Sequence, residues 1–186
     1  MTRMHALSEG STENYCLCGY RSRVLSMRGL EVDMVEAARG LLEGERDYIA
    51  NAANLSALLF QTLRGVNWAG FYFMREGRLV LGPFQGKPAC TSIELGDGVC
   101  GAAAQSRQTV VVDDVKRFPK HITCDPESKS EIVVPLIVEG QVVGVLDVDS
   151  HLPSRFDDRD RSALEAVVKL YLGASDFAPP LITSRR

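Results

Sequence analysis

The sequence predicts an α+β fold: a mostly antiparallel sheet of about five or six strands with helices packed against it. Two pairs of apolar segments turn back at Glu-Gly dipeptides, Glu76-Gly77 and Glu139-Gly140, which is typical of β-hairpins. Apolar residues at helical spacing occupy 31–63 and recur after Asp157. The predicted order is therefore helix, hairpin, loop, helix, strand, hairpin, helix.

Composition predicts one globular domain. The chain has 186 residues, of which 45% are hydrophobic and 24% charged. A net charge of −3 without a basic stripe argues against a nucleic-acid partner, and no apolar run approaches the roughly 20 residues that span a bilayer. Five cysteines in a chain of this length favour a reducing compartment, so we expect a cytoplasmic protein whose thiols can do chemistry.

The two ends of the chain are predicted to lie outside this domain. Residues 1–28 are polar and lack the apolar segment of a secretory signal, so we expect a poorly ordered extension. Its arginines leave organelle targeting open as an alternative, and we interpret its Cys16 and Cys18 as exposed thiols. The domain is expected over 29–173 and a C-terminal tail over 174–186.

The elements before the central hairpin follow from turn and capping residues. They are helices over 31–43 and 46–63, strands over 67–74 and 78–81, a loop over 82–91, a helix over 98–108 and a strand over 109–112. Gly65 ends the second helix and Asp97 caps the third. In the first strand, Trp68 and Tyr72 share one face because side chains alternate.

The second half is organised around residues 124–150. A loop over 113–129 without periodicity precedes them, and loops this long in a compact domain are more often functional than not. Asp147 and Asp149 stand at strand spacing among apolar residues, so they point to one face. Buried carboxylates need partners. The pair therefore indicates a ligand site, or else strand ends hydrogen-bonded to the 151–156 loop.

The register of the central hairpin decides whether Glu131 joins the two aspartates. A two-residue turn at Glu139-Gly140 would place Ile132 opposite Asp147 and turn Glu131 to the other face. A three-residue loop or a β-bulge would restore it. Proline inside a strand favours bulges or edges, so Pro135 is the place where such an irregularity would be expected.

Three cysteines are candidate nucleophiles or redox thiols. Cys90, Cys100 and Cys124 match no common zinc spacing, so we expect no metal, and packing as small apolar residues is the plain alternative. Cys100 follows the Asp97 cap, where a helix N-terminus favours a thiolate. Cys124 has Lys120, His121 and Lys129 nearby in sequence, which favours a thiolate equally.

A set of motifs resembles one family. The motifs are NWAGFYF, GPFQGKPAC, GDGVCGAAA, the loop cysteine Cys124, SEIVVPL and GVLDVDS, in this order. In this order and spacing they resemble the free methionine-R-sulfoxide reductases, which are single GAF-domain enzymes. The resemblance covers about 30–172 and implies a GAF catalytic domain.

The resemblance also implies roles. Cys124 would be the nucleophile and Cys90 and Cys100 the thiols that resolve it, with Cys100 as the alternative nucleophile. The implied substrate-binding residues are Trp68, Tyr72, Glu131, Asp147 and Asp149. Because Glu131 is among them, we predict the irregularity of the central hairpin, near Pro135. The implied substrate is the R-sulfoxide of free methionine, the implied reductant is thioredoxin, and the implied assembly is a homodimer.

The implied chemistry is consistent with these residue types. A thiolate attacks the sulfoxide sulfur, a carboxylic acid with a raised pKa protonates the oxygen, and the resulting sulfenic acid condenses with a second thiol. No cofactor is required. Two rival functions remain: a non-catalytic GAF module that binds a small molecule or senses redox state, and a zinc-stabilised interaction domain.

Overall fold

A computed structural model describes residues 33–120, 122 and 124–177. The predicted extension over 1–28 lies outside the described residues, as do Cys16 and Cys18, His121 and the last nine positions. Everything below concerns the compact unit that the described residues form.

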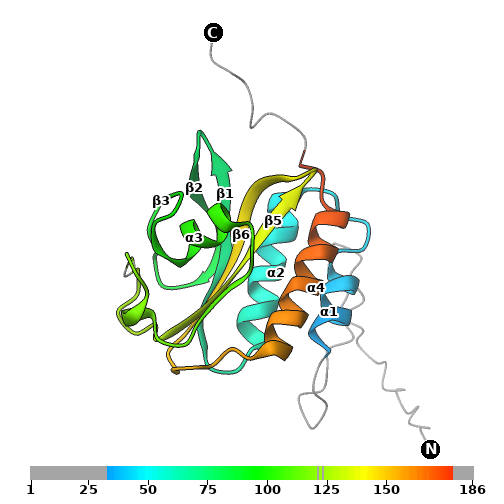
Figure 1. Cartoon of the computed structure of the whole chain (residues 1–186). Helices are drawn as coiled ribbons and strands as arrows, with labels where there is room; N and C mark the ends of the chain where they lie inside the picture. The colour runs from blue at the N-terminus through cyan, green and yellow to red at the C-terminus, as the bar shows by residue number, and fades with distance from the viewer. Residues whose placement is uncertain (1–32, 121, 123, 178–186) are drawn as a thin grey trace, which may run out of the picture. The chain divides into compact units, whose positions relative to one another are not determined.

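A six-stranded antiparallel sheet forms the centre of this unit, with strand order β3-β2-β1-β6-β5-β4 (Figure 1). The strands are β1 Val66–Arg75, β2 Arg78–Gly86, β3 Ser92–Glu94, β4 Val110–Val112, β5 Ser130–Val138 and β6 Gln141–Ser150. Both predicted Glu-Gly turns are present, with positive φ angles at both residues of each turn. The predicted α+β fold is confirmed.

Helices lie on both faces of the sheet (Figure 1). They are α1 Met34–Leu41, α2 Tyr48–Thr62, α3 Gly98–Ser106 and α4 Asp158–Ala174, with a short 3-10 helix η1 Val115–Arg117. The helices α1, α2 and α4 cover one face, while α3 and the long loop that follows β4 cover the other. Asp33, Asp47 and Asp157 cap their helices by accepting backbone hydrogen bonds.

Alternation along the central strands divides the apolar residues between two cores. In β1, Phe71 and Phe73 pack with the large helices, whereas Trp68 and Tyr72 pack with α3. In β6, Leu146 and Val148 similarly join the larger core. Asp147 and Asp149 therefore point to the α3 face, in the direction of Trp68 and Tyr72.

The predicted irregularity of the central hairpin is confirmed. The turn is a two-residue turn with Val138 opposite Gln141, but the register shifts between Leu136 and Ile137. The extra residue is Val143 on β6, across the hairpin from the stretch after Pro135. As a result Val133 lies opposite Asp147 and Glu131 opposite Asp149, so all three acids share one face.

The prediction of a loop from Gly82 was wrong, because β2 continues to Gly86. β3, which the sequence analysis did not predict, pairs only with residues 78–80 of β2. Beyond that point β2 has a neighbouring strand on the β1 side alone, so Pro83 needs no ladder hydrogen bond on its outer side. A proline at an open edge does not end a strand.

Residues after α4 extend the ordered domain beyond the expected start of the tail at 174. Asn51 Nδ2 donates to Ser175 Oγ at 3.0 Å, and the Phe177 ring lies 5.5 Å from the rings of Tyr48 and Tyr171. These contacts join the end of α4 to α2. Among the described helices, none has the length and apolarity that crossing a membrane requires.

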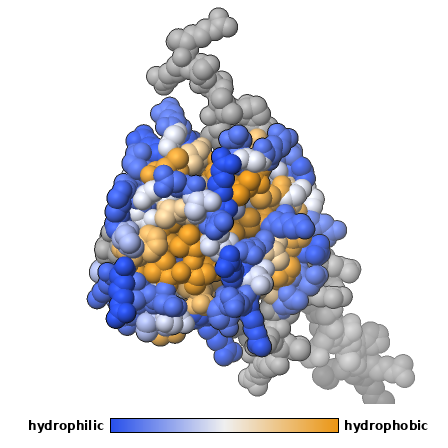
Figure 2. Space-filling view, in the orientation of Figure 1, coloured by the Kyte–Doolittle hydropathy of each residue, from blue (hydrophilic) through white to orange (hydrophobic). Residues whose placement is uncertain are grey.

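A surface groove of about 570 Å³ runs between β5 and α4. Apolar residues line its floor, including Val134, Pro135, Val168 and Leu172, and Arg107 and Arg161 lie at its sides. Figure 2 shows apolar surface interrupted by hydrophilic side chains on the face that carries β5 and α4. The half of β5 that lines this groove has no pairing with the short β4.

Candidate active site

A cavity of about 30 Å³ lies between the sheet and α3. Every predicted site residue except Cys90 lines it, namely Trp68, Tyr72, Cys100, Cys124, Glu131, Asp147 and Asp149. Cys90 is linked to this set by a disulfide bond with Cys124. Residues from β1, α3, β5, β6 and two loops thus converge on one place.

The three acids form the polar wall of the cavity. Glu131 and Asp147 are buried, with 6% of each residue exposed, and Asp149 is half-buried. Burial raises the pKa of Glu131 and of Asp149 well above their ordinary values, and the charge of Asp147 raises both further. Burial also raises the pKa of Asp147 to about 7. Near neutral pH this wall therefore holds protonated carboxyl groups.

Cys100 lies beside the acids on the first turn of α3. Its Sγ is 3.9 Å from Glu131 Oε1, and the residue is buried. Burial, followed by the charges of Asp147 and Glu131, raises the pKa of its thiol well above 9.0. The expectation that a helix N-terminus would favour its thiolate was wrong, because the tertiary fold directs the thiol at carboxylates.

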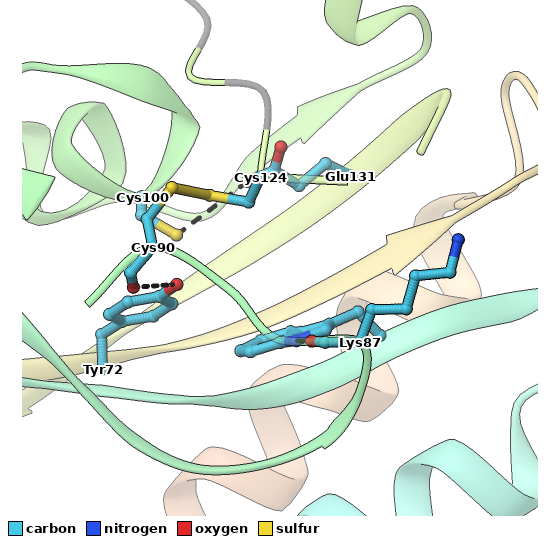
Figure 3. The surroundings of a disulfide bond; sticks show 7 residues. Tyr72, Lys87, Cys90, Cys100, Cys124 and Glu131 are labelled. Atoms are coloured by element: carbon cyan, nitrogen blue, oxygen red, sulfur yellow. Dashed lines mark hydrogen bonds between the residues drawn. A yellow bond between two sulfur atoms is a disulfide. The ribbon is translucent and has the colours of Figure 1, made fainter. Parts of the chain in front are cut away.

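Cys90 and Cys124 form a disulfide at the edge of the cavity (Figure 3). Their Cα atoms are 5.7 Å apart although 34 positions separate them in sequence. Both residues are half-buried, so a reductant can reach them. The structure therefore pairs two of the three predicted redox cysteines and leaves Cys100 as a free thiol next to them.

Trp68 and Tyr72 position the loop that carries Cys90. The indole of Trp68 donates to the Lys87 carbonyl at 3.1 Å, and the Tyr72 hydroxyl donates to the Cys90 carbonyl at 3.1 Å. Gly70 permits this arrangement, because a Cβ there would stand 2.6 Å from Trp68 Cη2. Both aromatics line the cavity, as predicted, but their hydrogen bonds to the loop were not predicted from the sequence.

A polar network that the sequence analysis missed holds the loop of Cys124. Asp125 is buried and accepts hydrogen bonds from the Glu127 backbone at 2.9 Å and from Asn67 Nδ2 at 3.2 Å. Lys87 Nζ lies 3.4 Å from Asp125 Oδ1 and also pairs with Glu127. By contrast, Lys120 pairs with Asp97 at 3.1 Å, so this lysine is engaged away from Cys124. Asp125 and Glu127, which closely follow the loop cysteine Cys124, were the sequence feature from which this network could have been predicted.

Residues 51–171 match the GAF domain family. Protein YtsP of Bacillus subtilis is 52% identical over 133 residues, which is 70% of this chain and 82% of that protein. Free methionine-R-sulfoxide reductase of Escherichia coli is 48% identical over 136 residues, 73% of this chain and 82% of the enzyme. This chain belongs to the free methionine-R-sulfoxide reductase family.

A solved member of the free methionine-R-sulfoxide reductases has the same fold. The enzyme of Neisseria meningitidis, determined in complex with its substrate, is 41% identical and superposes with a TM-score of 0.75. The match covers 78% of this chain and 87% of that one. The predicted family resemblance and the predicted single GAF domain are confirmed.

As a member of the free methionine-R-sulfoxide reductases, the chain combines three chemical elements in one cavity. A cysteine pair can alternate between dithiol and disulfide. Carboxyl groups with raised pKa can donate protons near neutral pH. Trp68 and Tyr72 offer stacked aromatic rings, with centroids 5.9 Å apart, as an apolar wall.

Proposed function

We propose that this protein reduces the R-sulfoxide of free methionine to methionine with a cysteine thiolate. The observation that carries the proposal is the Cys90–Cys124 disulfide at the edge of a cavity whose wall is Glu131, Asp147 and Asp149. Sulfoxide reduction requires a redox-active cysteine pair and a carboxyl group that donates a proton, and both lie at this cavity. The relatives named above, one of them solved with its substrate, support the same reaction.

The cavity suits a free amino acid better than a residue within a polypeptide. A free methionine sulfoxide carries an ammonium group, which carboxylates such as Asp147 and Asp149 can bind. Trp68 and Tyr72 can pack against the methyl and thioether end. A residue inside a protein has no ammonium group, and its flanking chain would have to enter an enclosed site.

The reaction runs from Cys124 to Cys90. The Cys124 thiolate attacks the sulfoxide sulfur while Glu131 protonates the oxygen; methionine leaves, and the oxygen remains on Cys124 as a sulfenic acid. The Cys90 thiol then attacks the Cys124 sulfur, and water leaves as the disulfide forms. The Cys90–Cys124 disulfide supports this choice of partners. Cys90 is thus the resolving thiol that we favour, and Cys100 is the alternative.

Thioredoxin is the reductant that we propose for the disulfide. Each turnover consumes two electrons, and a half-buried disulfide between two loops is open to attack by an external dithiol. A cytoplasmic location would keep Cys100 and the catalytic pair reducible. We further propose a homodimer, for which the apolar groove between β5 and α4 is a suitable contact; analytical ultracentrifugation would test it.

A thioredoxin-coupled assay tests the proposal. Wild type and the variants Cys124→Ser, Cys90→Ser and Cys100→Ser are offered free methionine-R-sulfoxide, its S-epimer and a sulfoxide-containing peptide. We expect turnover on the free R-epimer alone. Cys124→Ser should release no methionine, whereas Cys90→Ser should release one equivalent and then stop.

Three results would change the assignment. One equivalent of methionine from Cys124→Ser, with none from Cys100→Ser, would make Cys100 the nucleophile. Full turnover by Cys90→Ser would remove Cys90 from the resolving role. Absence of methionine from every sulfoxide would overturn the reductase proposal in favour of a non-catalytic GAF module.

A further inference from the structure

Cys100 is a buried thiol that the Cys90–Cys124 cycle does not use. It stands with Glu131 and Asp147, and one ligand atom from each of the three lies within 4.8 Å of the other two. All three residues are buried. Their elements, α3, β5 and β6, belong to the packed body of the domain. The cluster is therefore held by secondary structure and not by the two cysteine loops.

One atom of this cluster points to a ligand. Asp147 Oδ1 is buried and has no hydrogen-bond partner among the described residues, although Asp147 lines the cavity. A buried carboxyl oxygen without a partner destabilises the fold, and a bound ligand would remove that cost. The centre of a water-sized species can move within about 30 Å³ of this cavity, so an ion has room beside Asp147.

The side chains around the cavity suit a cation, which displaces their protons when it binds. Four acidic side chains line it together with Cys100, and the described lining contains neither lysine nor arginine. From the cluster and its unpartnered oxygen, we propose that the oxidised protein binds one divalent ion of the zinc class through the Cys100 thiolate and the Glu131 and Asp147 carboxylates. Water fills the fourth position.

The donor set defines the class of metal. Sulfur with two carboxylate oxygens suits Zn²⁺ or Co²⁺, whereas Mg²⁺ and Ca²⁺ prefer oxygen alone. Metal–ligand distances of about 2.0–2.3 Å place tetrahedral ligands roughly 3.5 Å apart. Because the ligand atoms now lie within 4.8 Å of one another, each pair approaches by roughly 1.3 Å at most on binding. Side-chain torsions can supply that movement while the backbone stays in place.

Metal binding has a consequence that rests on the proposed function. The ion would occupy carboxylates that we assign to the substrate ammonium, so zinc would compete with methionine sulfoxide. Bound zinc would then inhibit the reductase when the concentration of free zinc rises. The binding itself is independent of whether the protein reduces sulfoxides.

The test is a metal titration of the full chain in a Cys16→Ser/Cys18→Ser background, which removes the N-terminal thiols as ligands. The protein is oxidised to the Cys90–Cys124 disulfide, and the single remaining thiol is quantified. Co²⁺ binding is followed by its sulfur-to-metal charge-transfer absorption and its d–d bands, and Zn²⁺ binding by competition with a chromogenic chelator. Mg²⁺ serves as the hard-ion comparison.

We expect one equivalent of Co²⁺ with a thiolate charge-transfer band and displacement by Zn²⁺. Cys100→Ser should weaken Zn²⁺ binding at least about 100-fold, with a similar loss in Glu131→Gln, while the matched control Asp97→Asn should bind like the parent. Asp97 is an acid next to α3 that does not line the cavity.

Absence of the thiolate band in the parent protein would overturn the proposal without any variant, as would equal zinc affinity in Cys100→Ser. Zinc binding by a protein that reduces no sulfoxide would overturn only the proposed function. Sulfoxide turnover without metal binding would overturn only the metal site.

Discussion

The acids of the cavity show how position alters the chemistry of a side chain. Glu131, Asp147 and Asp149 are ordinary carboxyl groups in the unfolded chain, and burial raises the pKa of each in the folded protein. The same burial raises the pKa of Cys100. Each of these four groups therefore loses its proton less readily in the folded protein. Every group that does become charged makes the ionisation of its neighbours harder.

Asp147→Asn should stabilise the protein at alkaline pH. The pKa of Asp147 rises from 3.8 in the unfolded chain to about 7 in the fold, so stability is lost as pH rises between these values. We expect the substitution to increase the free energy of unfolding by on the order of 2 kcal/mol at pH 8, and to change it far less at pH 4. Urea denaturation at the two pH values measures this, and an equal effect at both would contradict it.

Glu131→Gln should remove the proton donor of the proposed reaction. We expect kcat to fall about 100-fold with little change in KM, because glutamine has no acidic proton to give. Wild type needs a Cys124 thiolate and a protonated Glu131, so its rate should rise and then fall with pH. The variant should lose the alkaline fall. Retention of that fall would assign the donor to another acid.

At the scale of elements, two irregular features build the site. The bulge at Val143 brings Glu131 to the face of the aspartates, since a regular ladder would turn it away. Ion pairs from Lys87 to Asp125 and Glu127 join the loop of Cys90 to the loop of Cys124. The bulge places the three acids on one face of the sheet, and the ion pairs hold the two cysteine loops together.

Lys87→Met should slow disulfide formation without slowing sulfoxide reduction. The ion pair lies at the surface, where solvent screens the charges and such pairs contribute little, so we expect a decrease of only about 5-fold in the rate of the second step. Single-turnover experiments that measure methionine release and free thiols separate the two steps. The control Lys116→Met, an exposed lysine on η1 that does not line the cavity, should leave both rates unchanged. Equal slowing of both steps would show that Lys87 acts on the substrate.

At the scale of the whole molecule, the disulfide connects the β2–β3 loop to the loop before β5 across 34 positions of sequence. These loops cover the α3 face of the sheet, while the larger core with α1, α2 and α4 lies on the other face. Formation or reduction of the disulfide therefore affects the two loops that cover the site and leaves the larger core unchanged.

The oxidised protein should be more stable than the reduced one. Closing a loop of this length restricts the unfolded chain by roughly 3–4 kcal/mol in the chain-entropy model. We expect the urea midpoint to fall when the disulfide is reduced, and Cys90→Ser to give the same midpoint with and without reductant. Equal urea midpoints for oxidised and reduced wild type would contradict this prediction.

The sequence by itself determined the fold class and most element positions, and it predicted residues that the structure brings together at the cavity. Hydrophobic period, Glu-Gly turns and aspartate caps are local signals, so they predicted the helices and both hairpins. The bulge that brings Glu131 into place was predicted from the hairpin register together with the family resemblance. The short β3 and the full length of β2 escaped, because an open edge beside Pro83 depends on strand order.

Only the tertiary structure decided which two of Cys90, Cys100 and Cys124 form the disulfide. Local helix geometry favoured a thiolate at Cys100, yet the fold surrounds that thiol with carboxyl groups and pairs Cys90 with Cys124 instead. The same holds for the network of Lys87, Asn67 and Asp125, whose partners come from three separate segments. A side chain's pKa and bonding partners depend on groups distant in sequence, and only folding brings those groups together.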